Sequence, residues 1–260
     1  MRLFNRYIGI DYSGAQTPTE SLKGLRVFEA TLSISAKEIP PPPSPRRYWT
    51  RRGLAEWLDV QLRETTPTIV GIDHAFSFPL AYFDRHRIEH NWNTFLDDFC
   101  KHWPTHEEHM YVDFVRNGTH GNAALRGGNT RWRRITEKRT SGAKSVFHFD
   151  VPGSVAKSTH AGIPWLRFLK LRHLASVHFW PFDGWDVTLG SHVVAEVYPS
   201  LWKGQYQVDD RTPDQQDAYT VCRWLAESDA KGELSVFFDP GLSDEERQIA
   251  RFEGWILGVR

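Results

Sequence analysis

Apolar segments that stop abruptly at an acidic residue are the feature of this chain that most constrains its fold. Three such segments are Tyr7–Asp11, Thr68–Asp73 and His192–Glu196. Each is rich in Ile, Val or Ala, the composition of a strand buried on both faces of a sheet. A carboxylate at the end of a buried strand is costly to desolvate unless it is paired or bound to a cation. Three strands that end in this way predict one shared site.

A fourth acidic pattern opens a predicted helix. Asp214 and Asp217 follow Pro213 and are three residues apart, so both side chains project from one face of the first helical turn. Proline at the first helical position is favourable because its missing N–H has no partner there in any case. The small Ala218 that follows would allow this helix to pack closely against a sheet. The helix start therefore predicts a further wall of the acidic site.

The acids also have an ordinary structural interpretation. Each of them could cap a strand or open a turn, and acids in a first helical turn gain from the helix dipole. Four clustered carboxylates, however, would repel one another and raise each other's pKa unless a divalent cation held them. Oxygen ligands without Cys or an organised His set favour Mg²⁺ or Mn²⁺ over zinc. We therefore expect a metal site in preference to four separate caps.

The order of predicted elements indicates an α/β fold, because strands and helices alternate along the chain. Predicted strands cover 6–11, 25–35, 68–73, 177–180 and 192–197. Predicted helices include one capped by Thr50, helical material from about 80 to 116, and segments at 163–175, 213–229 and 243–251. The stretch 117–145 is polar and rich in glycine. We expect one domain over 1–260, with a helical and loop-rich insertion at approximately 80–160.

Composition excludes several classes of protein. The chain of 260 residues has 32 basic and 32 acidic residues, so any contact with nucleic acid must come from a local patch. Cys100 and Cys222 are the only cysteines, and they indicate neither a disulfide framework nor a zinc knuckle. No apolar run approaches membrane-spanning length, and the N-terminus lacks a signal region. We expect a soluble, cytoplasmic protein that does not bind membranes.

The acidic motifs, taken in order, resemble the ribonuclease H-like superfamily, and the helix motif is closest to that of Holliday-junction resolvases. A more specific resemblance is to family 429 of the domains of unknown function, whose members are described as predicted nucleases. The matching motifs are Gly9-Ile10-Asp11, Gly71-Ile72-Asp73-His74-Ala75-Phe76-Ser77-Phe78-Pro79, Glu196-Val197-Tyr198-Pro199, Asp217-Ala218 and Glu253-Gly254-Trp255-Ile256. They occur in the correct order and are spread over most of the chain.

This resemblance implies a ribonuclease H-like mixed sheet and hydrolysis of phosphodiester bonds by two metal ions. The implied catalytic residues are Asp11, Asp73, Glu196 and Asp217. Asp11 would bridge two Mg²⁺ or Mn²⁺ ions, Asp73 and Glu196 would hold one of them, and Asp217, helped by Asp214, would hold the other. The implied partner is nucleic acid, without a preference between DNA and RNA.

A basic stretch offers a candidate surface for that substrate. Between residues 126 and 144 seven basic residues face a single acid, Glu137. Positive charge with an interleaved aromatic ring suits a phosphate backbone and a stacked base. The alternative is a solvated loop whose charge is balanced elsewhere, with Lys144 holding a single phosphate. The candidate substrate-binding residues are Arg126, Arg131, Trp132, Arg133, Arg134 and Lys144.

Two other functions are consistent with the sequence. His86, Glu89 and His90 fit the pattern His-x-x-Glu-His, in which a helix presents two imidazoles on one face to zinc, and this would make the protein a zinc metallohydrolase. The third possibility is a non-catalytic binding module that keeps the fold and uses its acids structurally or for a single ion. Metal content separates the three hypotheses.

Overall fold

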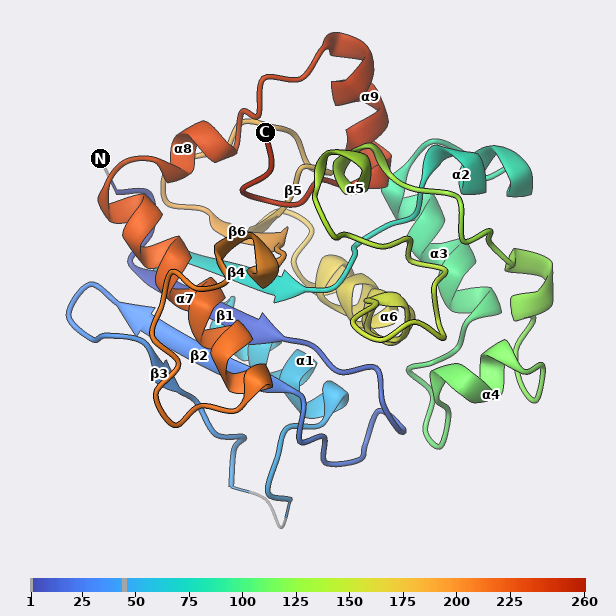
Figure 1. Cartoon of the computed structure of the whole chain (residues 1–260), viewed down its shortest axis with the longest axis horizontal. Coiled ribbons are helices and arrows are strands. Elements are labelled where there is room, and N and C mark those ends of the chain that lie inside the picture. The colour runs from blue at the N-terminus through green and yellow to red at the C-terminus, as the bar shows by residue number, and fades with distance from the viewer. Residues whose placement is uncertain (1, 44–45) are drawn as a thin grey trace.

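A six-stranded mixed sheet forms the centre of the molecule in a computed structural model that describes residues 2–43 and 46–260 (Figure 1). The strands are β1 (Arg6–Asp11), β2 (Arg26–Thr31), β3 (Lys37–Glu38), β4 (Thr68–Asp73), β5 (Val177–Trp180) and β6 (His192–Glu196). Their order across the sheet is β3-β2-β1-β4-β6-β5. Strands β1, β4, β6 and β5 are parallel to one another, whereas β2 runs antiparallel to β1 and to β3. The predicted α/β class is confirmed.

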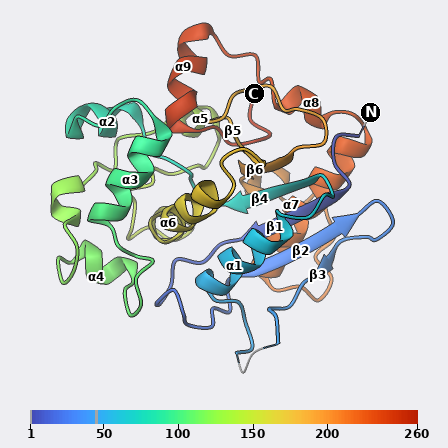
Figure 2. The same cartoon turned by 180° about the vertical axis from the view of Figure 1, so that it is seen from behind.

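Helices cover both faces of the sheet. They are α1 (Arg51–Gln61), α2 (Leu80–His86), α3 (Trp92–His102), α4 (Val112–Arg116), α5 (Ile135–Arg139), α6 (Ala156–Arg172), α7 (Pro213–Ala230), α8 (Leu234–Phe237) and α9 (Asp244–Glu253), with 3-10 helices η1 (Ala123–Arg126) and η2 (Pro199–Trp202). Helix α7 lies on one face, and α1 and α6 lie on the other, as the view from behind shows (Figure 2). None of the helices in the described ranges is long and apolar enough to cross a membrane.

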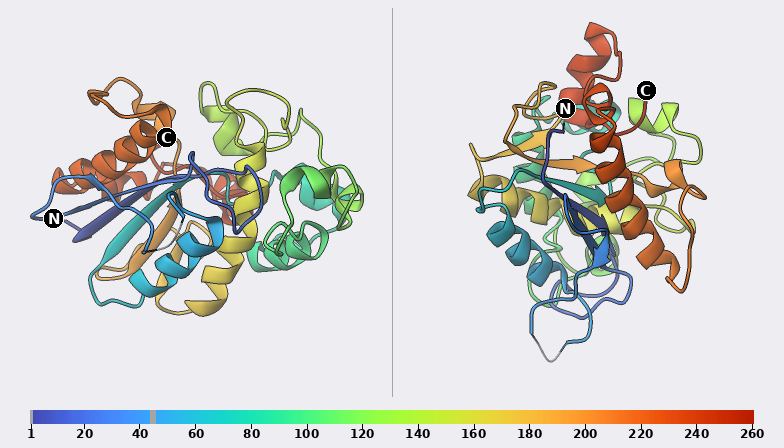
Figure 3. Two further views of the ribbon diagram at one scale, coloured as in Figure 1. Left: turned by 90° about the horizontal axis from the view of Figure 1, so that it is seen from below. Right: turned by 90° about the vertical axis from the view of Figure 1, so that its left-hand side faces the viewer.

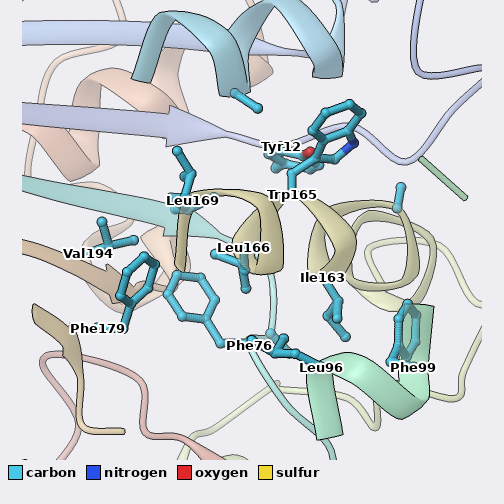
Figure 4. Packing of buried hydrophobic residues seen from close by; sticks show 14 of the residues in the cluster. Tyr12, Phe76, Leu96, Phe99, Ile163, Trp165, Leu166, Leu169, Phe179 and Val194 are labelled. Atoms are coloured by element: carbon cyan, nitrogen blue, oxygen red, sulfur yellow. The ribbon is translucent and has the colours of Figure 1, made fainter. Parts of the chain in front are cut away.

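Two hydrophobic clusters, one on each face, explain why the central strands are apolar throughout. In β4, Val70 and Ile72 belong to the cluster beneath α1 and α6, whereas Ile69 belongs to the cluster beneath α7. Successive side chains of a strand point to opposite faces, so a strand covered on both sides has no polar positions to alternate with. Figure 4 shows the first cluster, where Leu166 and Leu169 of α6 lie near Phe76 and Phe179.

The segment from α2 to α5 extends beyond the carboxyl ends of β1 and β4 (Figure 3). It shares its core with the sheet, because Phe83, Phe99 and Phe147 belong to the same cluster as Val70. The predicted helical and loop-rich insertion is therefore packed continuously onto the α6 face. Its position places the stretch 126–144 next to the ends of the central strands.

Helix α6 begins at Ala156, seven residues before the predicted start at 163. Proline inside a helix removes a backbone hydrogen bond and is unfavourable there. In the structure Pro164 is an interior residue, and the carbonyl of His160, which a helical N–H at position 164 would contact, accepts a hydrogen bond of 2.6 Å from the Thr105 hydroxyl. A tertiary contact thus satisfies the carbonyl that proline leaves free.

Candidate active site

Asp11 and Asp73 lie side by side at the carboxyl ends of neighbouring parallel strands. Strands β1 and β4 pair in register over their whole length, so that Arg6 is opposite Thr68 and Asp11 is opposite Asp73. Neighbouring strands are about 4.8 Å apart, and residues paired in register project to the same face. Two carboxylates therefore lie next to each other at the carboxyl-terminal ends of the central strands.

Helix α7 covers the face on which these two acids project. A side chain at Gly9 would come within 2.3 Å of the Ala218 carbonyl oxygen, and one at Gly71 would come within 2.8 Å of Val221. Only glycine permits so close an approach of a helix to a strand. Because Gly9 is two residues before Asp11, this contact brings the first turn of α7, with Asp214 and Asp217, over the strand ends. The expected close packing at Ala218 is confirmed.

The acids of the first turn do not cap α7. Thr212 is the N-cap and accepts a hydrogen bond from the Gln215 N–H, while the Gln215 side chain accepts one from Thr212 N–H. This reciprocal capping box satisfies the helix terminus without help from the acids. Among the described residues, none donates a hydrogen bond to the side chain of Asp73 or Asp217. A capping role therefore does not explain them.

These carboxylates raise one another's pKa. Burial raises the pKa of Asp11 well above its ordinary value, and the charges of Asp73, Asp217 and Asp214 raise it further, against one opposing backbone hydrogen bond. Burial, followed by the charges of Asp217 and Glu196, raises the pKa of Asp73. The pKa of Asp217 is raised by desolvation and then by Asp214, although its side chain remains exposed and Lys203 opposes the shift. Burial and like charge thus act together on Asp11, Asp73 and Asp217.

Glu196 is also the last residue of a parallel strand, but its side chain projects to the face of the sheet opposite to that of Asp11 and Asp73. Its register partner is Ile72, one residue before Asp73, and an offset of one residue reverses the side chain's direction. The carboxylate accepts hydrogen bonds from Arg134 Nη2 at 2.5 Å and Arg134 Nη1 at 2.7 Å, and one from the Phe76 N–H at 3.1 Å. Three hydrogen bonds thus engage both Glu196 oxygens, and the expected ligation of a metal by Glu196 together with Asp73 stays a prediction.

Arg134 is the main departure from the predicted substrate surface. Its side chain is 1 % exposed, and besides Glu196 it donates to Glu137 at 2.7 Å. The nearby Glu253 accepts hydrogen bonds from the Ile135 and Leu80 N–H groups. Arg134 is therefore a buried anchor that fixes α5 and α9 to the end of β6. The sequence signal for it was the unusual single acid of the basic stretch, Glu137, three residues after Arg134.

Most of the other predicted substrate contacts are also engaged within the protein. Arg126 forms two hydrogen bonds of 2.6 Å with Asp98, and Arg133 donates to the carbonyls of Glu137 and Ala143. Trp132 is partly buried and packs edge-on against Phe147. Of these candidates Arg131 is the one whose side chain is exposed. Four of the six candidate contacts, Arg126, Trp132, Arg133 and Arg134, are therefore engaged within the protein, and binding of substrate by this stretch stays a prediction.

Lys144 lines a pocket with one of the predicted acids. It lines a narrow pocket of about 20 Å³ together with Asp73, Glu196 and Tyr198, which has room for about one water molecule. Its ammonium group donates to the Pro152 carbonyl at 2.5 Å. The structure therefore keeps Lys144 as a candidate phosphate contact beside the acids.

The predicted zinc motif does not form. Helix α2 ends at His86, and Arg87 adopts a left-handed conformation that turns the chain before Glu89 and His90. His86 contacts the Gly127 carbonyl at 2.8 Å, whereas His90 contacts Asp84 at 3.0 Å. The two imidazoles therefore do not share a helical face. The expectation of a zinc metallohydrolase built on these residues is not supported.

The carboxylates of Asp11, Asp73, Asp214 and Asp217 are the kind of ligand that a hard divalent cation prefers, although they do not form a complete coordination shell. Within residues 2–43 and 46–260, no group of three or more His, Cys, Asp or Glu side chains is placed to hold a metal ion. Magnesium commonly uses only one or two protein carboxylates and completes its shell with water and substrate phosphate. The paired carboxylates of Asp11 and Asp73, which receive little hydrogen bonding, fit that requirement.

No family model, curated protein or solved structure matches the chain. The resemblance to the ribonuclease H-like superfamily therefore rests on the motifs quoted above.

Proposed function

We propose that the protein is a nuclease of ribonuclease H-like type that hydrolyses phosphodiester bonds with Mg²⁺ or Mn²⁺. The observation that carries this proposal is the pairing of Asp11 with Asp73 on adjacent parallel strands beneath the first turn of α7. Burial, followed by repulsion from neighbouring carboxylates, raises the pKa values of Asp11 and Asp73, and a divalent cation would offset that penalty. The arrangement is thus best explained as a site that is completed by cation and substrate.

Asp11 and Asp73 are the proposed principal ligands, because they are held by the register of two buried strands. Asp217 of α7 would supply a further metal ligand, helped by Asp214. If two ions bind, they would be held between the strand ends and the first turn of α7. When bound, the metal would activate the attacking water and offset charge on the scissile phosphate. Lys144, which lines a pocket with Asp73, would contact a phosphate oxygen.

Glu196 takes a positioning role in this proposal. Through Arg134 it ties β6 to α5 and α9, and through the Phe76 N–H it fixes the turn that follows Asp73. A buried arginine with several carboxylate partners is strongly destabilised when one partner is removed. We therefore expect replacement of Glu196 to lower stability as well as activity.

The test is an assay of labelled single-stranded, duplex and branched DNA and RNA with Mn²⁺. Asp11→Asn keeps the side-chain shape but removes a charge, so it should abolish cleavage and leave the fold intact. Asp214→Asn is the matched control and should have a smaller effect, because Asp214 lies at the margin of the cluster. An activity that survives Asp11→Asn does not come from this site. Absence of both cleavage and Mn²⁺ binding would favour a non-catalytic module.

A further inference from the structure

A narrow pocket lies at the carboxyl ends of β4 and β6, beside the chain that joins α5 to α6 (Figure 1). We call it the Tyr198 pocket. Asp73 and Glu196 line it from the two strands, Lys144 and Gly153 from the chain between α5 and α6, and Tyr198 from the segment after β6. Its volume of about 20 Å³ leaves room for about one water-sized atom. A ligand would therefore place a single oxygen in it.

Most charged groups that line this pocket are already paired with one another. The Arg134 guanidinium donates to Glu137 at 2.7 Å and to the Glu196 carboxylate at 2.5 Å and 2.7 Å. In contrast, Asp73 and Lys144 line the pocket without forming an ion pair to any described residue. The pocket thus has one acid and one cation whose charges remain available to a ligand.

The Lys144 ammonium group is held at the pocket and keeps hydrogen bonds to donate. It donates to the Pro152 carbonyl at 2.5 Å, and a side chain at Gly153 would come within 3.6 Å of its nitrogen. An ammonium group has three donors and no acceptor, so further N–H groups remain after the Pro152 contact. Lys144 can therefore donate to an oxygen in the pocket from its present position.

Tyr198 offers a second donor. Its hydroxyl forms no hydrogen bond to another residue in the described part of the chain. A side chain at Gly142 would come within 3.7 Å of the hydroxyl oxygen, so the ring extends to the segment that carries Lys144. Tyr198 packs against the hydrophobic cluster beneath α7, and η2 begins at the next residue, Pro199. The hydroxyl is therefore a donor that the fold holds in place and leaves without an acceptor.

The charge of the pocket indicates which kind of oxygen would enter it. An ammonium group and a hydroxyl both stabilise a negatively charged oxygen, and hydrogen bonds to charged acceptors are stronger than those to neutral ones. Asp73 would repel such an oxygen unless a divalent cation offset its charge. A phosphate oxygen next to a metal ion on Asp73 meets both conditions. The alternative occupant is a water molecule held between Asp73 and Lys144.

We infer that the Tyr198 pocket receives one non-bridging oxygen of the scissile phosphate, and that Tyr198 and Lys144 both donate to it. This inference rests on the proposed function and adds Tyr198 to the residues that contact substrate. Because the pocket has room for one oxygen, it distinguishes the two non-bridging oxygens of a phosphodiester. The second oxygen would lie outside the pocket, and the phosphate would bind in one orientation, as in-line attack by water requires.

The first experiment measures cleavage with Mn²⁺ of oligonucleotides that carry a phosphorothioate of either configuration at the cleaved position. Sulfur is larger than oxygen and a weaker acceptor, so one diastereomer should be cleaved more slowly than the other. Tyr198→Phe and Lys144→Gln should each lower kcat/KM for the all-oxygen substrate about 10- to 150-fold, the range for one hydrogen bond to a charged group. In both variants the preference between diastereomers should shrink, because the contact that sulfur weakens is already lost.

Matched controls remove the same chemical groups elsewhere. Lys138→Gln removes an exposed ammonium group from the same stretch of chain, and Tyr111→Phe removes another hydroxyl without a hydrogen-bond partner among the described residues. Neither residue lines the pocket. Both controls should keep the rate and the preference between diastereomers. Thermal scans should show equal stabilisation by Mn²⁺ in Tyr198→Phe, in Lys144→Gln and in the unmodified protein, because the proposed metal ligands are unchanged.

A second experiment measures binding without turnover. Isothermal titration calorimetry follows a thymidine trinucleotide with the Asp11→Asn protein as reference. Adding Tyr198→Phe or Lys144→Gln to this reference should weaken binding at least about 10-fold, whereas the two control substitutions should not change it. The hydroxyl of Tyr198 makes no hydrogen bond within the described residues, so its removal tests the pocket without disturbing the fold.

The outcomes separate the pocket from the proposed function. Cleavage by Tyr198→Phe at the unmodified rate, with an unchanged preference between diastereomers, would overturn the inference, assign the pocket to water and leave the proposed function standing. Absence of cleavage of any substrate would count against the proposed function. In that case weaker trinucleotide binding by both variants would still support a phosphate pocket, whereas unchanged or absent binding would overturn it.

Discussion

Both ends of α7 place carboxylates near the sheet, but the two ends differ in how many hydrogen bonds those carboxylates accept. Near its start, Asp217 faces Asp11 and Asp73, and each of these three acids has a raised pKa. Near its end, Asp229 is 1 % exposed and accepts hydrogen bonds from Leu3 N–H, Phe4 N–H and the Tyr7 hydroxyl at 2.8–3.1 Å. Burial and the Asp229 contact raise the pKa of that tyrosine.

This difference separates a structural acid from a functional one. A buried carboxylate that receives three donors fastens the N-terminus of the chain to α7. Carboxylates that receive few donors and repel one another contribute nothing comparable to folding. Proteins retain such clusters at functional sites, where the lost stability is recovered on ligand binding. The predictions below test whether the two ends respond in opposite directions.

The largest expected effect is at the structural end. Asp229→Ala leaves the Leu3 and Phe4 N–H groups without an acceptor, while the Tyr7 hydroxyl keeps the Phe4 carbonyl, so it should lower the free energy of unfolding by about 2–5 kcal/mol. Urea denaturation measures the change. Tyr7→Phe, which removes only one donor, is the control and should cost about 1 kcal/mol. Equal stability of Asp229→Ala and the unmodified protein would show that the clamp is dispensable.

Metal should stabilise the other end. Mg²⁺ or Mn²⁺ at one hundred times its Kd should raise the free energy of unfolding by about 2.7 kcal/mol, because only the folded protein brings the acids together. Asp11→Asn should lose most of this increment, whereas Tyr7→Phe should keep it. Thermal scans with and without EDTA provide the measurement. A shift of equal size in Asp11→Asn would place the bound ion elsewhere.

The smallest expected effect is a rise in the free energy of unfolding, whereas Asp229→Ala should lower it. Asp73→Asn removes one of the repelling charges, so in EDTA at pH 7 it should raise the free energy of unfolding by about 0.5–2 kcal/mol, the usual gain when a strained functional residue is replaced. Urea denaturation with the same protocol compares it directly with Asp229→Ala. Destabilisation by Asp73→Asn would mean that this acid supports the fold.

The pH dependence provides a further check on that variant. Because the pKa of Asp73 is raised in the folded state, the folded protein binds more protons than the unfolded chain between the ordinary and the raised pKa. Stability of the metal-free protein should therefore fall as pH rises through that window. The advantage of Asp73→Asn should shrink as the pH is lowered toward the ordinary value for aspartate. An advantage that does not change with pH would exclude charge repulsion as its cause.

Local patterns predicted most of the elements but not the engagement of the basic stretch. The strands that end at Asp11 and Asp73 and the capped helix after Thr50 follow from composition and capping, which act over a few residues. Arg134 was predicted to bind substrate, because positive charges with an interleaved aromatic ring suit a phosphate backbone. Its burial depends on Glu196, which is 62 residues away in the chain and cannot be paired with it from local sequence.

The sequence by itself determined that apolar strands end in carboxylates and that a helix opens with two more. Those patterns are properties of consecutive residues, so they are visible in the chain. Only the tertiary structure decided which acids face one another. In the pairing of β4 with β1, Asp73 is opposite Asp11, whereas in the pairing of β4 with β6, Glu196 is opposite Ile72. Because side chains alternate along a strand, Asp73 projects to the same face as Asp11, and Glu196 projects to the other face, where it binds Arg134.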